Sequence, residues 1–562
     1  MARRISLLLA GFLLSSTASA VESSRLQQGQ TLIRAMVEPL RPGIRLATLH
    51  ERALFSVPPL VRFYESRDHL PAWFTDSVVR HHAITLLDVL QRADDEGLSP
   101  EHYHARAIDR LLGAIRNGDD SIENLVHLDL LLTDAFLTYG SHLLAGHINP
   151  EALSAEWFIA RPETDLEALL TDALSRVGIR TSLESLRPTH PDYRRLTEAL
   201  RTYRTIAERG GWPVVPDGKP IGAGSSGERV RSLRARLAIT GDLEESGLPA
   251  TSWDSALERA VRKFQRRHGL AGDGVVGPAT LAELNVPVEQ RIDQMLANLE
   301  RWRWLPVDLG PRFIMVNIAD FMLHVVDDSR PVMTMKVVVG RSYRRTPVAS
   351  GEMTNITFRP AWNVPEIIAA TDVLQKVKRD RSYLSRNRIR VFRGGKEVDP
   401  GSIDWSRYSE ASFPFTLRQE PGAQNALGRV RFNFDNRFNL YLHDTPEREL
   451  FAREMRDYSS GCIRIERPVE LAAWLLGGGR WSSSGVSAAM NEARQQTVAL
   501  PRNVPVHILY WTAWVAPDGT VAFRRDIYHR DERLIEAFQQ RRRENGVTIA
   551  WSESDDAPAE GR

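Results

Sequence analysis

Hydrophobic positions between about residues 25 and 205 recur with the spacing of α-helices. Two stretches, 77–92 and 128–144, carry apolar side chains at intervals of three and four residues, and glycine and proline follow each of them. This periodicity is helical and not alternating. It predicts an all-α N-terminal domain, which we place at residues 21–210 and interpret as a scaffold.

A compact unit follows a boundary rich in glycine and serine. Residues 222–227 read Gly-Ala-Gly-Ser-Ser-Gly, which is the composition of a turn or linker. Beyond this boundary, short runs at helical spacing predict three helices, and the turn at 268–278 leads into the last of them. We therefore expect a small three-helix module at residues 226–287.

The hydrophobic period changes in the second half of the chain. Residues 313–318 and 322–326 are rich in β-branched and aromatic side chains, which favours strands joined as hairpins. Similar short segments continue along the chain, so we predict a mostly β domain over residues 310–530. Within it, residues 341–420 are polar and basic, and we interpret this long segment as an inserted lid. The predicted fold class is multidomain α+β.

The two ends of the chain have patterns of their own. Two arginines, an apolar run at 5–14 and the sequence Ala18-Ser19-Ala20 are typical of a cleavable secretory signal over residues 1–20. The run is shorter than the roughly 20 residues that cross a bilayer, so cleavage is favoured over an uncleaved anchor. Residues 552–562 are acidic and rich in small side chains, which predicts a disordered tail.

The charges of the chain almost cancel. The formal net charge is +2, and loss of Arg3 and Arg4 with the signal would bring it to zero. A neutral chain does not indicate nucleic-acid binding. No metal-ligand spacing is present, so we expect neither a metal nor a cofactor, and the pair His102 and His104 is expected at the surface. Solvated helix faces are the expected position of the arginine clusters at Arg541-Arg542-Arg543 and at Arg229, Arg231, Arg234 and Arg236.

Cys462 is the only cysteine among the 562 residues. A lone cysteine is a buried apolar side chain, an intermolecular bridge or a reactive thiol. It ends the sequence Ser459-Ser460-Gly461-Cys462 and lies 19 positions after His443, which favours a reactive thiol. His443, at the end of a predicted strand, would supply the base that a thiol nucleophile needs. Backbone N–H groups of the turn would stabilise an oxyanion, because Gly461 allows a close approach.

The three-helix unit resembles the small peptidoglycan-binding module. Both retained wall binding and a role as a structural spacer stay open for it. The matching residues are Val261, Phe264-Gln265, Gly269-Leu270, Asp273-Gly274, Gly277 and Thr280-Leu281.

The second half of the chain resembles the YkuD-type catalytic domain of large periplasmic L,D-transpeptidases. With the helical scaffold and the binding module, the resemblance covers nearly the whole mature chain. Many members carry a histidine directly before Gly-Cys, whereas this chain, like the larger members, has Ser460 there. His443 is then the only nearby base. The matching segments are Trp362–Pro365, Pro421-Gly422, Asn425–Gly428, Tyr441–Pro446, Phe451, Ser459–Arg464 and Thr512–Val515.

The resemblance implies a cysteine-dependent acyl transfer. Cys462 would attack the carbonyl of the meso-diaminopimelate in a tetrapeptide stem and release D-alanine. A diaminopimelate amine of another stem would resolve the thioester into a 3→3 cross-link. His443 would move the protons, and the N–H groups of Gly461 and Cys462, beside Ser460, would bind the oxyanion.

Two further side chains are candidate site residues with alternatives that stay open. Arg464 either binds a substrate carboxylate or braces the turn. Tyr441 lies two positions before His443, so both should point to one face of the strand. Tyr441 would line the site or orient the base, and core packing is an equal alternative.

Two other functions remain open on the sequence. Water in place of the acceptor amine would give an L,D-carboxypeptidase that trims tetrapeptides to tripeptides. A non-catalytic wall-binding scaffold is the second alternative, and the presence of both His443 and Cys462 argues against it. The resemblance further implies a periplasmic location, peptidoglycan stem peptides as donor and acceptor, a carbapenem as covalent inhibitor of the thiol, and protein partners in wall synthesis.

Overall fold

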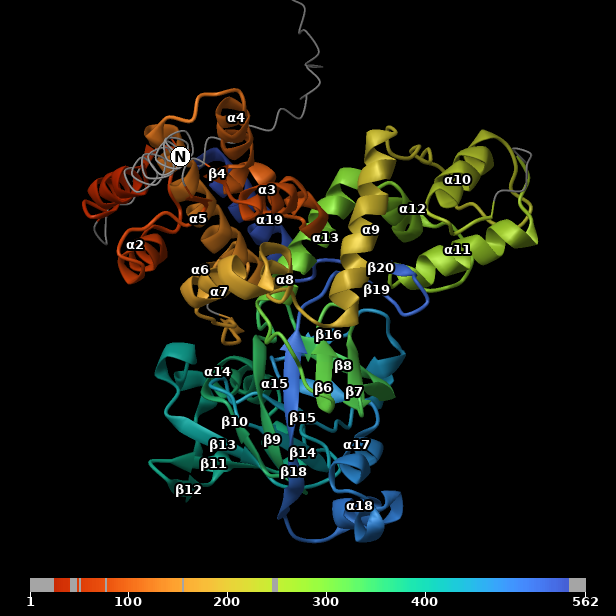
Figure 1. Ribbon diagram of the computed structural model, residues 1–562. Coiled ribbons are helices and arrows are strands. Elements are labelled where there is room, and N and C mark those ends of the chain that lie inside the picture. The colour runs from red at the N-terminus through yellow and green to blue at the C-terminus, as the bar shows by residue number, and fades with distance from the viewer. Residues whose placement is uncertain are drawn as a thin grey trace, which may run out of the picture.

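The computed structural model describes residues 25–40, 48–49, 52–75, 78–153, 156–244 and 251–544. The predicted signal and the predicted tail lie outside these ranges. Figure 1 shows the N-terminal helices and the three-helix module side by side above a β-rich domain. This arrangement confirms the predicted multidomain α+β class. None of the helices within the described ranges is both long and apolar enough to cross a membrane.

The N-terminal domain is built around α5 (Ile122–Ala145), which is buried on nearly all sides. Ser121 caps this helix, because its side chain accepts a hydrogen bond from the Asn124 N–H. The helix predicted from residue 77 begins later than expected. Val78 and Val79 form the short strand β4, and helix α3 begins at His81. The helices around α5 are α2 (Val57–Ser66), α3 (His81–Gln91), α4 (Ala105–Arg116), α7 (Leu166–Asp172) and α8 (Ile179–Glu184).

The scaffold and the β-rich domain share secondary structure. Helix α9 (Pro191–Glu208) packs on α13 (Val288–Arg303), and its buried side chains belong to the core of the β-rich domain. Strand β5 (Trp157–Phe158) pairs with β9 (Val348–Phe358) in parallel. The core of the N-terminal domain itself ends at Leu186. The predicted scaffold, which extends to residue 210, therefore includes a helix that packs in the core of the β-rich domain.

The three-helix module is present as predicted, with its own small core. Its helices are α10 (Glu228–Ile239), α11 (Ser255–Arg267) and α12 (Pro278–Leu284). The module contacts the hairpin of β19 (Ala513–Val515) and β20 (Val521–Phe523) through an exchange of hydrogen bonds: Arg267 donates to the Val521 carbonyl, and Arg524 donates to the Arg267 carbonyl.

The β-rich domain is a sheet that closes on itself. The strand order is β14-β15-β17-β8-β7-β6-β18-β9-β5, and β14 also pairs with β9, which joins the two sides. Short β16 pairs with β8. The bounds are β6 (Phe313–Asn317), β7 (Met322–Asp327), β8 (Arg330–Gly340), β14 (Val430–Phe434), β15 (Tyr441–His443), β16 (Asp457–Ser459), β17 (Ile463–Ile465) and β18 (Gln496–Leu509).

The inserted segment is a small subdomain with its own core, which we call the cap (residues 362–419). It contains a four-stranded sheet of order β10-β13-β11-β12 and the helices α14, α15 and α16. The predicted start near residue 341 is wrong, because β9 is a central strand of the large sheet. The bounds are β10 (Trp362–Val364), α14 (Glu366–Ile368), α15 (Leu374–Arg379), α16 (Tyr383–Arg386), β11 (Ile389–Arg393), β12 (Lys396–Val398) and β13 (Phe415–Gln419).

Several charged side chains predicted at the surface are buried. His104 Nε2 lies 2.8 Å from Asp134 Oδ2 in the scaffold core, and His102 is buried beside it. Arg236 stacks on Trp212, with 3.9 Å from the guanidinium carbon to the ring centroid. Arg234, also buried, pairs with Asp254. His104, Arg234 and Arg236 each contact a partner that lies elsewhere in the sequence, which compensates for the desolvation of their polar groups.

Candidate active site

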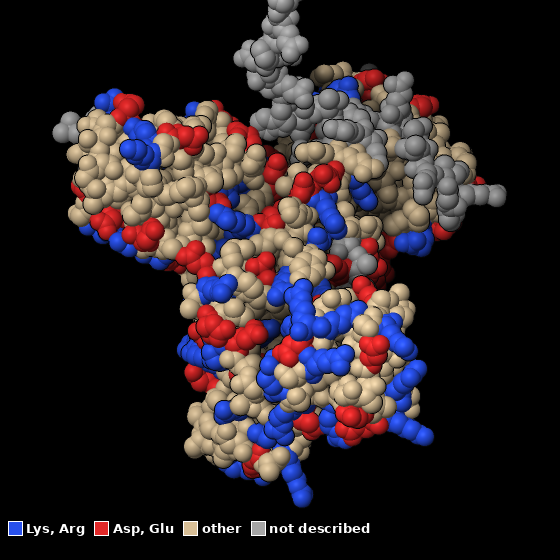
Figure 2. Space-filling model, turned by 180° about the vertical axis from the view of Figure 1, so that it is seen from behind, with Lys and Arg blue, Asp and Glu red and all other residues tan. Residues whose placement is uncertain are grey.

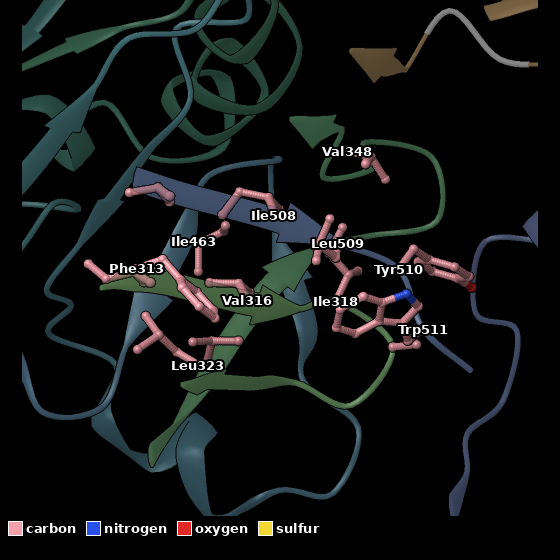
Figure 3. Close-up of a cluster of buried hydrophobic side chains, with 14 of the residues drawn as sticks. Phe313, Val316, Ile318, Leu323, Val348, Ile463, Ile508, Leu509, Tyr510 and Trp511 are labelled. Carbon is pink, nitrogen blue, oxygen red and sulfur yellow. The ribbon is translucent and has the colours of Figure 1, made fainter. Parts of the chain in front are cut away.

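The end of the large sheet places four polar side chains on one face of two adjacent strands. Strands β15 and β17 pair in parallel, with His443 opposite Arg464 and Leu442 opposite Ile463. Leu442 and Ile463 are fully buried in the core, where Figure 3 shows Ile463 among the apolar side chains. Because side chains alternate along a strand, His443, Arg464 and their second neighbours Tyr441 and Cys462 point away from that core.

The turn before Cys462 is held by the hydroxyl of Ser459, the first residue of the Ser459-Ser460-Gly461-Cys462 sequence. Ser459 Oγ accepts a hydrogen bond from the Gly461 N–H at 3.1 Å and donates to the Cys462 carbonyl at 2.6 Å. Gly461 has φ of +117°, a conformation that L side chains rarely adopt. The Gly461 N–H, one of the two groups that we predicted to bind an oxyanion, donates to Ser459 Oγ in this structure, so the Cys462 N–H is the remaining candidate.

A second hydroxyl supports this turn from a loop that the sequence analysis did not single out. Thr346, which is fully buried, donates to the Gly461 carbonyl at 2.7 Å and accepts from the Gly340 N–H at 2.8 Å. The phenol of Tyr528 donates to the Gly340 carbonyl and accepts from the Thr346 N–H. The nucleophile turn, our name for residues 459–462 with the candidate nucleophile Cys462, is therefore anchored to the end of β8.

His443 is held in one orientation. Its Nδ1 lies 2.6 Å from the Asp444 carbonyl, and only 4% of the residue is exposed. A carbonyl can only accept, so Nδ1 carries the proton, and Nε2 of the neutral ring keeps its lone pair. Burial, with a smaller effect of Arg464, lowers the pKa of His443 to about 3. At neutral pH the imidazole is a neutral base.

Cys462 is a half-buried thiol in this structure. Burial raises the pKa of the Cys462 thiol above its ordinary value, while Tyr441 and Arg431 act in the opposite direction. A raised pKa for the thiol and a lowered pKa for His443 together favour the neutral pair over a preformed thiolate–imidazolium pair. The arrangement therefore fits deprotonation of the thiol by His443 as it attacks.

Tyr441 points to the same face as His443, as predicted. The two ring centroids are 5.8 Å apart at 64°. The phenol interacts with the Cys462 thiol and with the indole of Trp362, the first residue of cap strand β10. Tyr441 therefore lines the site, and the alternative of core packing is not observed.

Arg464 and Ser460 take part in bracing contacts. Arg464 forms an ion pair with Glu447, which supports the bracing alternative for this residue. Ser460 is exposed, and its Oγ accepts from Arg344 at 3.2 Å. Arg344 also pairs with Asp372 of the cap at 2.6 Å, so one guanidinium joins the cap to the turn.

Arg431 is a cation of the site that the sequence analysis missed. It lies on β14 directly opposite His443 of β15. Its guanidinium carbon is 5.2 Å from the centroid of the Tyr441 ring. The alternation of Arg431 with buried Phe432 was visible in the sequence, but its position beside His443 depends on the strand register.

The described residues contain no group of three or more His, Cys, Asp and Glu side chains placed to hold a metal ion. The chemistry available in this site is that of a thiol, a neutral imidazole, a phenol and two guanidinium groups. Such a set suits acyl transfer through a covalent intermediate. Figure 2 shows that Lys and Arg side chains gather over the β-rich half of the molecule, on the face opposite the view of Figure 1.

Comparison with protein families assigns three segments. Residues 311–508 match the YkuD family, described as the L,D-transpeptidase catalytic domain. Residues 226–284 match the family described as "Putative peptidoglycan binding domain", and residues 58–200 match the scaffold domain. The chain thus combines a scaffold domain, a peptidoglycan-binding domain and an L,D-transpeptidase catalytic domain.

Two curated relatives match parts of the chain, and the first agrees with this assignment. A curated protein of Haemophilus influenzae, described as "Putative L,D-transpeptidase", is 34% identical over 288 residues, which are 50% of this chain and 58% of that protein. The alignment therefore spans less than two thirds of that relative. The zinc D-Ala-D-Ala carboxypeptidase of Streptomyces albus G is 38% identical over 72 residues, 11% of this chain and 25% of that enzyme.

Solved structures with similarity to the chain include L,D-transpeptidases. One from Stackebrandtia nassauensis has a TM-score of 0.21 and 14% identity, and covers 53% of this chain and 96% of its own. One from Xylanimonas cellulosilytica has a TM-score of 0.17 and 16% identity, and covers 52% of this chain and 99% of its own. At these scores the domain assignment rests on the sequence matches.

Proposed function

We propose that this chain, which contains a YkuD-type L,D-transpeptidase catalytic domain, is a peptidoglycan L,D-transpeptidase that forms 3→3 cross-links through a thioester on Cys462. The observation that carries the proposal is the common face of β15 and the nucleophile turn. There, Tyr441 contacts both the His443 ring and the Cys462 thiol, and the chain has no other thiol.

In the first half of the reaction, His443 Nε2 accepts the thiol proton as Cys462 Sγ attacks the carbonyl of the third stem residue. The Cys462 N–H donates to the oxyanion that forms. When the C–N bond breaks, the His443 imidazolium returns its proton to the leaving amine of D-alanine. The product is a thioester between Cys462 and the donor stem.

In the second half, the side-chain amine of an acceptor diaminopimelate attacks the thioester carbonyl. The amine loses a proton to His443, the C–S bond breaks, and the thiolate takes the proton back. General acid–base transfer of this kind contributes roughly 10²–10⁴-fold. Because His443 is neutral at the pH of the cell, it can act as the base in both halves.

The setting of this reaction is part of the proposal. The peptidoglycan-binding domain supports a wall-bound substrate, and the pattern at residues 1–20 supports export to the periplasm. A carbapenem would acylate Cys462 by the same attack, with its strained lactam carbonyl in place of the stem carbonyl. Protein partners in wall synthesis remain an expectation of the resemblance.

Mass spectrometry of purified protein incubated with a disaccharide-tetrapeptide tests the proposal. We expect a dimer that has lost one D-alanine per link, and an adduct on the protein at the peptide that contains Cys462. The Cys462→Ala variant, which removes only a half-buried sulfur, should fold and form neither.

Each other outcome assigns a different function. A tripeptide without dimer identifies an L,D-carboxypeptidase, in which water resolves the thioester. A folded protein that binds the substrate but forms no adduct and no product identifies a wall-binding scaffold. An adduct that persists in Cys462→Ala contradicts the assignment of the nucleophile.

A further inference from the structure

We propose that Arg431 forms a carboxylate-binding subsite beside the nucleophile and recognises the free C-terminal carboxylate of the donor stem. The identity of the donor rests on the proposed function, whereas the anion preference of the subsite does not. The subsite would make the enzyme selective for the length of the donor stem. A stem that ends one residue after the scissile bond would place its carboxylate at Arg431 and be favoured over a longer one.

The position of Arg431 follows from the strand register. Strand β14 places Arg431 opposite His443 on β15, and β15 in turn pairs with β17, which follows Cys462. Neighbouring strands are about 4.7–4.9 Å apart, so Arg431, His443 and Arg464 form a row across one face. Cys462 lies two positions before Arg464 on the same face, level with Tyr441. Between Arg431 and the thiol lies the Tyr441 ring, which contacts both the guanidinium and the thiol.

The charge of Arg431 is unbalanced within the protein. Among the described residues, no carboxylate lies within ion-pair distance of it, and its Nε is buried with no hydrogen-bond partner. Arg431 is half-buried, whereas two fully buried arginines of the described chain each have a carboxylate partner: Arg301 with Asp531 at 2.5 Å, and Arg267 with Asp242 at 2.5 Å. Leaving a charged donor buried without a partner is costly, so this guanidinium is prepared for an anion from outside.

A carboxylate is the anion that fits the proposed donor. In a tetrapeptide stem the carboxylate of the leaving residue lies three bonds beyond the scissile carbonyl carbon. A stem placed with that carbonyl at Cys462 and its end across Tyr441 would bring the carboxylate towards Arg431. A pentapeptide stem has a neutral amide at the same place, which forfeits the ion pair. Guanidinium groups bind carboxylates through parallel N–H donors, which adds directional preference to charge.

Two thiol reagents test the anion preference without any peptidoglycan. Iodoacetate and iodoacetamide alkylate Cys462 by the same step: Sγ forms a bond to carbon, iodide leaves, and the thiol proton passes to a base. They differ only in a carboxylate against an amide. Their rate ratio is therefore insensitive to the pKa of the thiol, and a change in the ratio reports anion binding.

For Arg431→Gln we expect the iodoacetate-to-iodoacetamide ratio to fall about fivefold, which is the size measured for one solvent-exposed ion pair. Arg431→Lys should retain part of the ratio, since it keeps the charge without the planar donors. Arg480→Gln is the matched control, because Arg480 is an exposed cation stacked on Trp481 at 4.7 Å, and its loss changes the net charge equally. Its ratio should equal that of the parent protein.

The peptide experiment uses a tetrapeptide stem with a free C-terminal carboxylate and the same stem with a C-terminal amide. The parent protein should form the acyl-enzyme about tenfold faster from the free acid, and Arg431→Gln should form it at similar rates from both. An unchanged alkylation ratio in Arg431→Gln, or a variant that still prefers the free acid as strongly as the parent, would overturn the subsite. If the iodoacetate-to-iodoacetamide ratio falls in Arg431→Gln as expected but the parent protein forms no acyl-enzyme from either stem, the anion site stands and the proposed function is rejected.

Discussion

The hydroxyl of Thr346 donates to the carbonyl of Gly461 at 2.7 Å, although the two residues are 115 positions apart. The same oxygen accepts from the Gly340 N–H at 2.8 Å. A fully buried hydroxyl thus connects the last residue of β8 to the residue before the nucleophile. The position of Cys462 therefore depends on a side chain that takes no part in the chemistry.

Replacing Thr346 with valine keeps the shape and removes the hydroxyl. Two buried backbone groups then lose their partner, at about 1–3 kcal/mol each, so the free energy of unfolding should fall by an amount of that order. The alkylation rate of Cys462 should also change, because the turn loses its anchor. Urea unfolding and iodoacetamide kinetics measure the two effects. Thr346→Ser, which keeps the hydroxyl, is the control, and equal losses in both variants would contradict the role of the hydrogen bonds.

The ion pair of Arg344 with Asp372 should hold the cap in place. The two carboxylate oxygens of Asp372 accept from the two terminal guanidinium nitrogens of Arg344 at 2.6 and 2.8 Å, and both side chains are at most one third exposed. We expect a coupling free energy of about 1 kcal/mol in the double-mutant cycle of Arg344→Gln and Asp372→Asn.

Hydrogen exchange gives the structural readout for this pair. Amides of 366–379 should exchange faster in either single variant than in the parent protein. Arg386→Gln breaks an exposed ion pair inside the cap and should leave that exchange unchanged. Equal protection in all variants would show that the cap core alone holds the cap.

The pH dependence of Cys462 alkylation should be that of a neutral thiol. Burial raises the pKa of the thiol and lowers the pKa of His443 to about 3. The thiolate fraction should therefore rise about tenfold for each pH unit between pH 6 and 9, without an earlier plateau. Stopped-flow kinetics with iodoacetamide provide the measurement. A rate plateau below pH 7 would instead indicate a preformed thiolate–imidazolium pair.

Acid should destabilise the β-rich domain through buried neutral histidines. Burial lowers the pKa of His507 from 6.5 to about 4. The unfolded chain then binds a proton that the folded chain does not, so this stabilisation is present above pH 6.5 and is lost as the pH falls towards 4. The contribution is at most about 3 kcal/mol. In His507→Gln, the free energy of unfolding should fall less steeply over this window; an identical slope would contradict the assignment.

Helix α9 should matter for the catalytic core more than for the scaffold core. Leu200 of α9 and Leu86 of α3 are both fully buried, but they belong to different clusters. Leu200→Ala should lower the urea concentration at which Cys462 becomes fully reactive, with a cost of roughly 2–5 kcal/mol. Leu86→Ala should affect that transition much less. Equal shifts would mean that the two cores unfold as one unit.

Features that depend on local spacing were predictable from the sequence. The helix α5, the three-helix module and the change to strands after residue 310 follow from hydrophobic period alone. The common face of Tyr441 and His443 follows from alternation within one strand. In each case the residues that determine the outcome are neighbours along the chain.

Features that depend on partners distant in sequence were not predictable in this way. Histidine and arginine are residue types expected at the surface, but His104 and Arg236 are buried because each has a partner in the interior. His104 lies against Asp134, and Arg236 stacks on Trp212 and donates to the Leu284 carbonyl. The start of the cap was misplaced, since only strand pairing shows that β9 belongs to the large sheet.

The features of the candidate active site also separate into those set by local sequence and those set by distant partners. The sequence by itself determined the candidate nucleophile and the candidate base, because a lone cysteine after a glycine turn and a histidine at a strand end are local features. Only the tertiary structure showed that the Gly461 N–H donates to Ser459 Oγ and that Thr346 donates to the Gly461 carbonyl. It also showed that Arg431 lies opposite His443. The physical reason is strand pairing: a hydrogen-bonded ladder fixes which residues of separate segments become neighbours, and the sequence of one strand does not identify the strand that pairs with it.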